Sequence, residues 1–391
     1  MKFYTPPASG FNNSNSRSAG LDFLRFIAAS LVLCNHAGDF GDAGAIFQKT
    51  PGIAGIILLK LSGLGWTAVD IFFVLSGFLV SGLLFKEAAQ SGTVSITRFL
   101  IRRGFKIYPS FWAMITVTSV WAWLQGNPVS FAGLGHELFY VQNYLGGICG
   151  HTWSLAVEEH FYFLLAGWFF VLKCRANAGK RMSFKGIPDC FLTTAVLCLM
   201  LRGITWWVCT SDNTTWNAHW FDRVTHVLID SLFFGVLLSH YWHNVWAEQT
   251  KRKIISRRAV FVITGICLLM PSFADVMDIQ WYRIFGFILI YLGAGCLLLS
   301  CLSLDYLPCP TVIKWLSWLG KYSYSVYLWH FFVGYHLFPL IEVKLNHPWG
   351  WLLNFLLYFA SSWSLGIIAA KIIEFPALRC RDRWFPSLIH A

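Results

Sequence analysis

Two basic side chains lie on one face of the first long apolar segment. Arg25 and His36 are eleven residues apart, which at 100° per residue is three turns plus about 20°. They therefore point the same way, about 16 Å apart along a helix axis, and Asp22 precedes Arg25 by one turn and can pair with it. Neutral histidine takes up a proton near pH 7, so His36 is a candidate general base for a hydroxyl nucleophile. If the segment spans a membrane, extension of both side chains to its two surfaces explains the pattern equally well.

A second group of candidates lies at the start of a later apolar segment, in the sequence HTWSLAVEEHFYF. The group consists of His151, Trp153, Ser154, Glu158, Glu159, His160 and Tyr162. Glu158 and the two residues after it are consecutive, so they point to three sides of a helix and at least one faces protein or water. Two acids in one apolar helix favour a functional cluster, and the alternative is a polar belt at the membrane surface.

Further polar side chains share a face in the sequence GKYSYSVYLWH. Ser323, Tyr327 and His330 follow one another at helical spacing. They are either residues of the site or part of a hydrogen-bonded seam between two helices. An earlier apolar segment contains Ser76 and Gly77. Both are small, so we assign them first to close packing between helices.

Three aspartates, Asp70, Asp222 and Asp230, lie within or beside other apolar segments. Asp222, His226 and Asp230 lie at intervals of four residues, so they follow one another along a helix. They are placed either to hold a polar substrate or to pair with Arg223. Asp70 precedes the apolar sequence IFFVLSGFL, and we expect it to support the site or the structure.

A run of basic residues precedes the pair Tyr108-Pro109. Its members are Arg98, Arg102, Arg103 and Lys106. A basic cluster at the start of a helix can bind phosphate groups. The same residues also fit ordinary positive charge at a cytoplasmic membrane surface, or contacts with anionic lipid.

The composition shows what must position these residues. The chain has 391 residues, of which 56% are hydrophobic and 13% are charged. Soluble domains carry about 25% charged residues, about twice the share in this chain. The low charge and high hydrophobicity therefore exclude a disordered chain, a coiled coil and most soluble enzymes. Ten apolar segments are long enough to cross a bilayer as helices. They are Leu21–Phe40, Leu61–Phe85, Ile107–Leu124, Thr152–Leu172, Pro188–Cys209, Val224–Trp246, Ala259–Ala274, Tyr282–Leu302, Tyr322–Ile341 and Trp349–Ile373. We therefore predict an all-α, polytopic transmembrane bundle of about ten spans.

The net charge of +11 follows from the predicted topology. Lysine and arginine gather in alternate loops, which places both termini in the cytoplasm. Nucleic acid is therefore not needed to explain the charge. We divide the chain into a disordered tail (1–20), a transmembrane domain (21–376) and a basic cytoplasmic tail (377–391). The sequence indicates no metal site, because the cysteines and histidines lack metal-ligand spacing.

Together these segments resemble the membrane-bound acyltransferase 3 family of bacterial acyltransferases, over nearly the whole chain. The resemblance rests on Arg25-x10-His36, the sequence VDIFFVLSGFL, Arg103-x-x-Lys106-x-Tyr108-Pro109, the sequence WSLAVEEHFY, the sequence DSLFFG from Asp230, the sequence YSYSVYLWH and Glu374-x-Pro376. It implies transfer of an acyl group, often acetyl, from acetyl-CoA or another acyl-CoA. That donor is a co-substrate, and no cofactor is permanently bound. The implied acceptor is a hydroxyl of an envelope carbohydrate, an exported polysaccharide or a glycolipid, at the bacterial inner membrane.

The resemblance also implies roles for individual residues. Arg25 and His36 match the family's essential pair, Arg103 and Lys106 match its donor-associated motif, and Glu158 matches its acid. His36 would act as a base or as a transient acyl carrier, and we expect Glu158 to orient its imidazole. A transporter of a sugar, lipid or acyl donor is the alternative, because spans that contain ionisable residues fit it too. A third interpretation is that the chain is a structural partner in an envelope complex.

Overall fold

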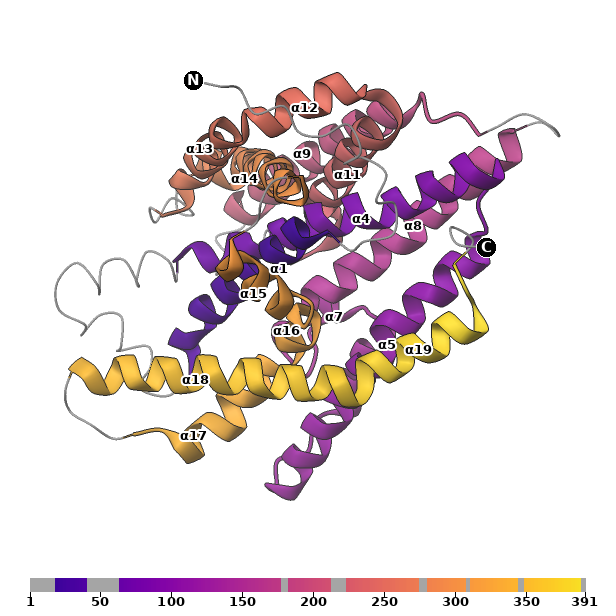
Figure 1. Cartoon of the computed structure of the whole chain (residues 1–391). Coiled ribbons are helices and arrows are strands. Elements are labelled where there is room, and N and C mark those ends of the chain that lie inside the picture. Colours follow the sequence, from indigo (N-terminus) through magenta and orange to yellow (C-terminus); the bar gives the residue numbers. More distant parts are fainter. Residues whose placement is uncertain are drawn as a thin grey trace.

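The chain folds into helices, as its composition predicts. The computed structural model describes residues 18–40, 63–176, 182–211, 223–273, 280–306, 310–343 and 348–387, and these contain helices but no strand. The all-α class is therefore confirmed for the described part of the chain (Figure 1).

The helices are α1 (Ala19–His36), α4 (Ala68–Ser91), α5 (Ile96–Leu124), α6 (Phe131–Leu138), α7 (Gln142–Leu145), α8 (Trp153–Arg175), α9 (Ile187–Ser211), α11 (Thr225–His240), α12 (Glu248–Ser256), α13 (Arg258–Leu269), α14 (Gln280–Leu302), α15 (Thr311–Gly320), α16 (Ser323–Phe332), α17 (Phe338–Ile341), α18 (Pro348–Ala369) and α19 (Phe375–Trp384). Short 3-10 turns lie at η1 (Ala37–Asp39), η2 (Gly65–Thr67), η4 (Met270–Phe273) and η6 (Ser303–Asp305), and π turns at η3 (Tyr241–Val245), η7 (Val333–Leu337) and η8 (Ala370–Glu374).

Five helices of the described residues are long and apolar enough to cross a membrane. They are Gly65–Ser91, Trp153–Arg175, Ile187–Val208, Ile284–Asp305 and Leu352–Trp384, and the bent pair α12 and α13 counts as a sixth if it forms one span. Two of the other predicted segments contain a π turn, η3 after the 16 residues of α11 and η7 after the 10 residues of α16. The count of ten spans and the cytoplasmic placement of the termini remain predictions.

Glycines bring α4 and α11 into close contact. A Cβ atom on Gly77 would lie 1.9 Å from the carbonyl oxygen of Leu232, and one on Gly235 would lie 2.3 Å from that of Val74. The two backbones therefore touch where neither residue has a side chain, the usual device for packing apolar helices within a membrane. The packing role predicted for Gly77 is confirmed.

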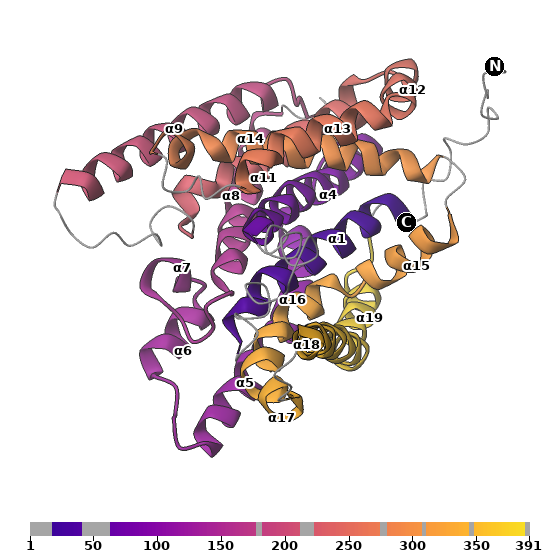
Figure 2. The same cartoon turned by 90° about the vertical axis from the view of Figure 1, so that its left-hand side faces the viewer.

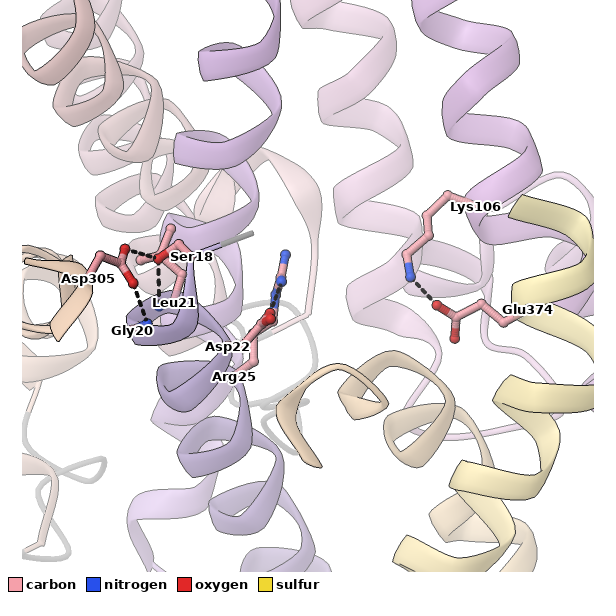
Figure 3. Close-up of polar contacts among 8 residues, drawn as sticks. All are labelled: Ser18, Gly20, Leu21, Asp22, Arg25, Lys106, Asp305 and Glu374. Carbon is pink, nitrogen blue, oxygen red and sulfur yellow. Dashed lines mark hydrogen bonds and ion pairs between the residues drawn. The ribbon is translucent and has the colours of Figure 1, made fainter. Parts of the chain in front are cut away.

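The start of α1 is held by a similar close contact and by an acid. A Cβ atom on Gly320 would lie 1.8 Å from the carbonyl oxygen of Asp22, so α15 packs directly on α1. The Asp305 carboxylate accepts hydrogen bonds from the Ser18 hydroxyl at 2.5 Å and from the Gly20 amide at 3.0 Å (Figure 3). These contacts fix the end of α1 that carries Arg25.

The last helices lie along α5. The chain runs from α18 through the π turn η8 into α19, and α19 lies beside α5 near the C-terminal end of the chain (Figure 1). A view turned by 90° shows α1 in the interior, with α4 on one side and α15 and α16 on the other (Figure 2). Residues 377–384 of the predicted basic tail thus lie in α19, a helix packed on the bundle. Residues 1–17 of the predicted N-terminal tail lie outside the described residues.

Replacement of Gly77 by alanine tests the contact between α4 and α11. We expect Gly77→Ala to lower the free energy of unfolding by at least about 1–3 kcal/mol, because the new methyl group overlaps backbone. Gly167→Ala is the matched control, since a Cβ atom there meets nothing within 4 Å and alanine favours a helix by up to about 1 kcal/mol. The melting temperatures of the two variants in detergent provide the measurement. Equal melting temperatures would contradict the contact.

Candidate active site

The side chain of His36 pairs with an acid at the end of its own helix. The Nδ1 atom of His36 lies 2.7 Å from Oδ2 of Asp39, where the 3-10 turn η1 follows α1. Because a carboxylate only accepts hydrogen bonds, Nδ1 carries the hydrogen and Nε2 is left to take up a proton. His36 is about a quarter exposed, so the arrangement is that of an oriented general base within reach of a ligand. Asp39 was missed from the sequence, although its spacing of three residues from His36 was visible.

Glu158 has partners other than His36. Its carboxylate accepts hydrogen bonds from the hydroxyl groups of Ser76 and Tyr162. The predicted pairing of Glu158 with His36 is therefore not formed, because the acid is engaged by α4 and by its own helix, and Asp39 takes its place beside the imidazole. Ser76 has this polar role in addition to the packing role predicted for it.

Three imidazoles lie next to one another at the end of α1. The ring of His330 lies 5.4 Å from that of His36 and 4.9 Å from that of His151, measured between centroids. Phe331 meets the His36 ring edge-on at 4.8 Å. The predicted face of α16 thus brings His330 to His36. His330 itself is fully buried.

A polar seam joins α8 to α16. The hydroxyl groups of Ser154 and Tyr327 are 2.5 Å apart, and the Tyr327 hydroxyl donates to the carbonyl oxygen of His151 at 2.7 Å. The hydrogen-bonded seam, one of the two readings of these residues, is therefore present. Ser323 is buried one turn before Tyr327. Trp153 packs its ring edge-on against Phe73 at 6.3 Å.

Three of the four predicted donor-binding residues of α5 contact the C-terminal segment, and the two segments run antiparallel. We call this row of contacts the ladder. Lys106 pairs with Glu374 (Figure 3), Arg102 lies 3.1 Å from the carboxylate of Asp382, and Arg98 donates to the carbonyl oxygen of Pro386 at 2.9 Å. The cations recur every four residues along α5, so they share one face of that helix. The structure thus brings them together, each with a partner on the C-terminal segment.

Arg103 lies on the next face of α5, toward the acids of α8. Its guanidinium lies 5.5 Å from the centre of the Tyr162 ring, and Tyr162 in turn donates to Glu158. Glu159 accepts from the hydroxyl of Tyr108. At the start of α1, Arg25 pairs with Asp22 at 2.6 Å, as predicted (Figure 3).

Asp230 belongs to a separate buried cluster between α4, α9 and α11. Its carboxylate lies 2.6 Å from the guanidinium of Arg202, and both side chains are fully buried. Asp230 therefore does not pair with Arg223, because it faces α9. Asp70 accepts from Ser231 at 2.7 Å. Sequence analysis overlooked Arg202, although an arginine within an apolar segment is a signal in itself.

Asp222 lies outside the described residues, so its predicted place beside His226 is not addressed. Within the described ranges, no group of three or more histidine, cysteine, aspartate or glutamate residues is arranged to hold a metal ion.

Variants of the Arg202–Asp230 pair test its role in stability. We expect Asp230→Ala to cost about 3–5 kcal/mol, because it leaves the Arg202 charge buried without a carboxylate. The double variant Arg202→Met with Asp230→Leu should melt closer to wild type, since no charge remains. Asp189→Ala, at an exposed acid in the first turn of α9, is the control. A double variant that loses as much stability as the single variants Arg202→Met and Asp230→Leu together would contradict the pairing. Thermal unfolding in detergent provides the measurement.

Comparison with known proteins places the chain in a family. The family model described as an acyltransferase domain matches residues 18–371. The chain is 24% identical over 343 residues to peptidoglycan O-acetyltransferase OatA of Listeria monocytogenes, covering 80% of this chain and 51% of that protein. It is 26% identical over 310 residues to O-acetyltransferase OatA of Staphylococcus aureus, covering 71% of this chain and 48% of that protein.

The match to these relatives covers only part of their sequences. The chain spans about half the length of the curated relatives it matches. No solved structure matches it. The family model nevertheless covers far more than half of this chain. It includes the histidine cluster, the polar seam and the basic residues of α5, whereas the C-terminal partners of those basic residues lie beyond residue 371. The chain therefore belongs to the acyltransferase 3 family of membrane-bound acyltransferases.

Proposed function

We propose that this chain transfers an acetyl group from acetyl-CoA to a hydroxyl group of a bacterial envelope carbohydrate. The observation that carries the proposal is the pairing of His36 Nδ1 with Asp39, which leaves Nε2 as a base on a partly exposed ring. The names of the relatives, both O-acetyltransferases and one of them a peptidoglycan enzyme, support a carbohydrate acceptor. The apolar helices support a multi-pass protein, and we place it in the bacterial inner membrane.

The proposed reaction begins when Nε2 of His36 takes the proton of the acceptor hydroxyl. The hydroxyl oxygen attacks the thioester carbonyl, a carbon–oxygen bond forms, and the carbon–sulfur bond breaks. The proton on His36 then passes to the leaving thiolate and yields free CoA. Asp39 holds the ring in one tautomer and stabilises the imidazolium, as the acid does in other base–orienter pairs.

The donor would enter from the end of the bundle that carries the basic residues. Arg98, Arg102, Arg103 and Lys106 supply positive charge for the CoA phosphates. Arg103 lies on the face of α5 toward Tyr162 and Glu158, while the polar seam of Ser154 and Tyr327 leads on to the three imidazoles. The thioester would follow this line of polar side chains toward His36.

Variants of the base and its acid test the mechanism. We expect His36→Ala and Asp39→Asn each to lower acetyl transfer by at least about 10²-fold, because one removes the base and the other its orientation. Transfer of label from radiolabelled acetyl-CoA to glycan extracts, with purified protein in nanodiscs, provides the measurement. His336→Ala is the control, since that ring packs on Trp121 and Phe332 instead.

Each outcome of this assay has a definite meaning. A folded His36→Ala protein with wild-type transfer would exclude His36 as base or acyl carrier. Wild-type protein that releases no CoA and labels no glycan would contradict acetyl-CoA as donor. Uptake of a sugar or donor into vesicles without covalent change would instead support the transporter reading.

Replacement of Arg103 tests the donor side. We expect Arg103→Gln to raise the KM for acetyl-CoA by about 10-fold with little change in kcat, because a charge-assisted phosphate contact is worth about 1.5–3 kcal/mol. Arg258→Gln, at the exposed start of α13, is the matched control. An unchanged KM would remove Arg103 from the donor site.

A further inference from the structure

The end of the chain covers the basic face of α5. We name residues Asp382–Pro386 the C-terminal strap. Arg102 lies 3.1 Å from the Asp382 carboxylate and donates to the carbonyl oxygen of Phe385. Arg98 donates to the carbonyl oxygen of Pro386 at 2.9 Å. The strap thus supplies oxygen atoms to two guanidinium groups that sequence analysis assigned to the donor's phosphates.

Aromatic contacts hold the strap in the same place. The ring of Phe105 lies 6.0 Å from those of Trp384 and Phe385. Phe105 is within one turn of both Arg102 and Lys106 on α5, so the strap contacts the surface that the cations occupy. Upstream, Glu374 anchors the segment through Lys106 and through Ser325, which donates to it at 2.7 Å.

The anchor and the strap differ in burial. Glu374 is buried, whereas Asp382 is about half exposed and Trp384 is 63% exposed. Exposed ion pairs stabilise a protein only weakly, because water competes for both partners. A phosphate binds a guanidinium through two parallel, charge-assisted hydrogen bonds, which a single carbonyl oxygen cannot match. A phosphorylated ligand can therefore displace the strap and leave the anchor in place.

We propose that the C-terminal strap competes with the phosphates of the acyl donor for Arg98 and Arg102, and so regulates access to the donor site. The proposal rests on the proposed function for the identity of the donor. Donor binding releases the strap from α5, and loss of the donor allows it to return. Asp382 is the residue that opposes binding, because its carboxylate, which also pairs with the neighbouring Arg381 at 2.8 Å, takes the position of an anionic ligand beside Arg102.

Proteolysis tests displacement without any need for catalysis. The chain offers trypsin cleavage sites at Arg379, Arg381 and Arg383, within and just before the strap. In nanodiscs of zwitterionic lipid, we expect CoA to speed trypsin cleavage at these sites several-fold. In Asp382→Ala, cleavage at Arg379, which does not adjoin residue 382, should already be fast without CoA. Anionic nanodiscs without CoA form a separate arm, and faster cleavage in that arm alone would assign the phosphate to lipid headgroups and overturn the proposal.

Kinetics provide the second test. We expect Asp382→Ala to lower the KM for acetyl-CoA about 2–5-fold with kcat unchanged, the size of effect expected from an exposed pair. Glu248→Ala is the matched control, because it removes an exposed pair with Lys251 on α12, away from α5. A raised KM in Asp382→Ala would show that the strap helps to build the donor site, and would overturn the competition.

The two tests separate this proposal from the proposed function. Faster cleavage with CoA in a protein without acetyl transfer would support the strap and contradict the function. Acetyl transfer with cleavage that CoA slows or leaves unchanged would support the function and overturn the strap. Protein that neither binds CoA nor transfers acetyl would contradict both.

Discussion

A single buried carboxylate, that of Glu374, joins three parts of the molecule. One of its oxygens accepts from Lys106 of α5 and the other from Ser325 of α16, while Glu374 itself closes the π turn η8. A carboxylate in an apolar bundle is costly unless it is paired, so Glu374 favours the fold only while Lys106 and Ser325 lie beside it. The position of α5 relative to α16 follows from this contact. So does the course of α19 along the basic face of α5.

The position of His36 at one end of α1 depends on how the other end of that helix is held. Gly320 allows α15 to touch the backbone of α1 at Asp22, and Asp305 accepts hydrogen bonds from Ser18 and Gly20. From this fixed start the helix carries His36 to the opposite end, beside the ring of His330. α16 therefore links the two regions, since its Ser325 contacts the anchor of the donor side and its His330 contacts the proposed base.

Sequence spacing predicted the contacts that lie within one helix and missed those that depend on which helices meet. The pair of Asp22 with Arg25 and the shared face of Tyr327 and His330 follow from helical periodicity, and both are present. The Ser76 partner of Glu158 and the Arg202 partner of Asp230 lie on other helices, and periodicity carries no information about them. Asp39 was missed although it lies three residues after His36, a spacing that brings side chains together both in an α-helix and in the 3-10 turn η1.

The buried pair of Arg202 and Asp230 has a consequence for the biosynthesis of the protein. α9 emerges from the ribosome before α11, and it carries into the membrane an arginine whose carboxylate partner has not yet been made. A lone arginine at the centre of a span costs at least about 2.5–3.5 kcal/mol on insertion scales. The carboxylate of Asp230, which arrives with α11, offsets part of that cost. The two helices are therefore expected to leave the insertion machinery as a hairpin, with the salt bridge formed as they enter the lipid.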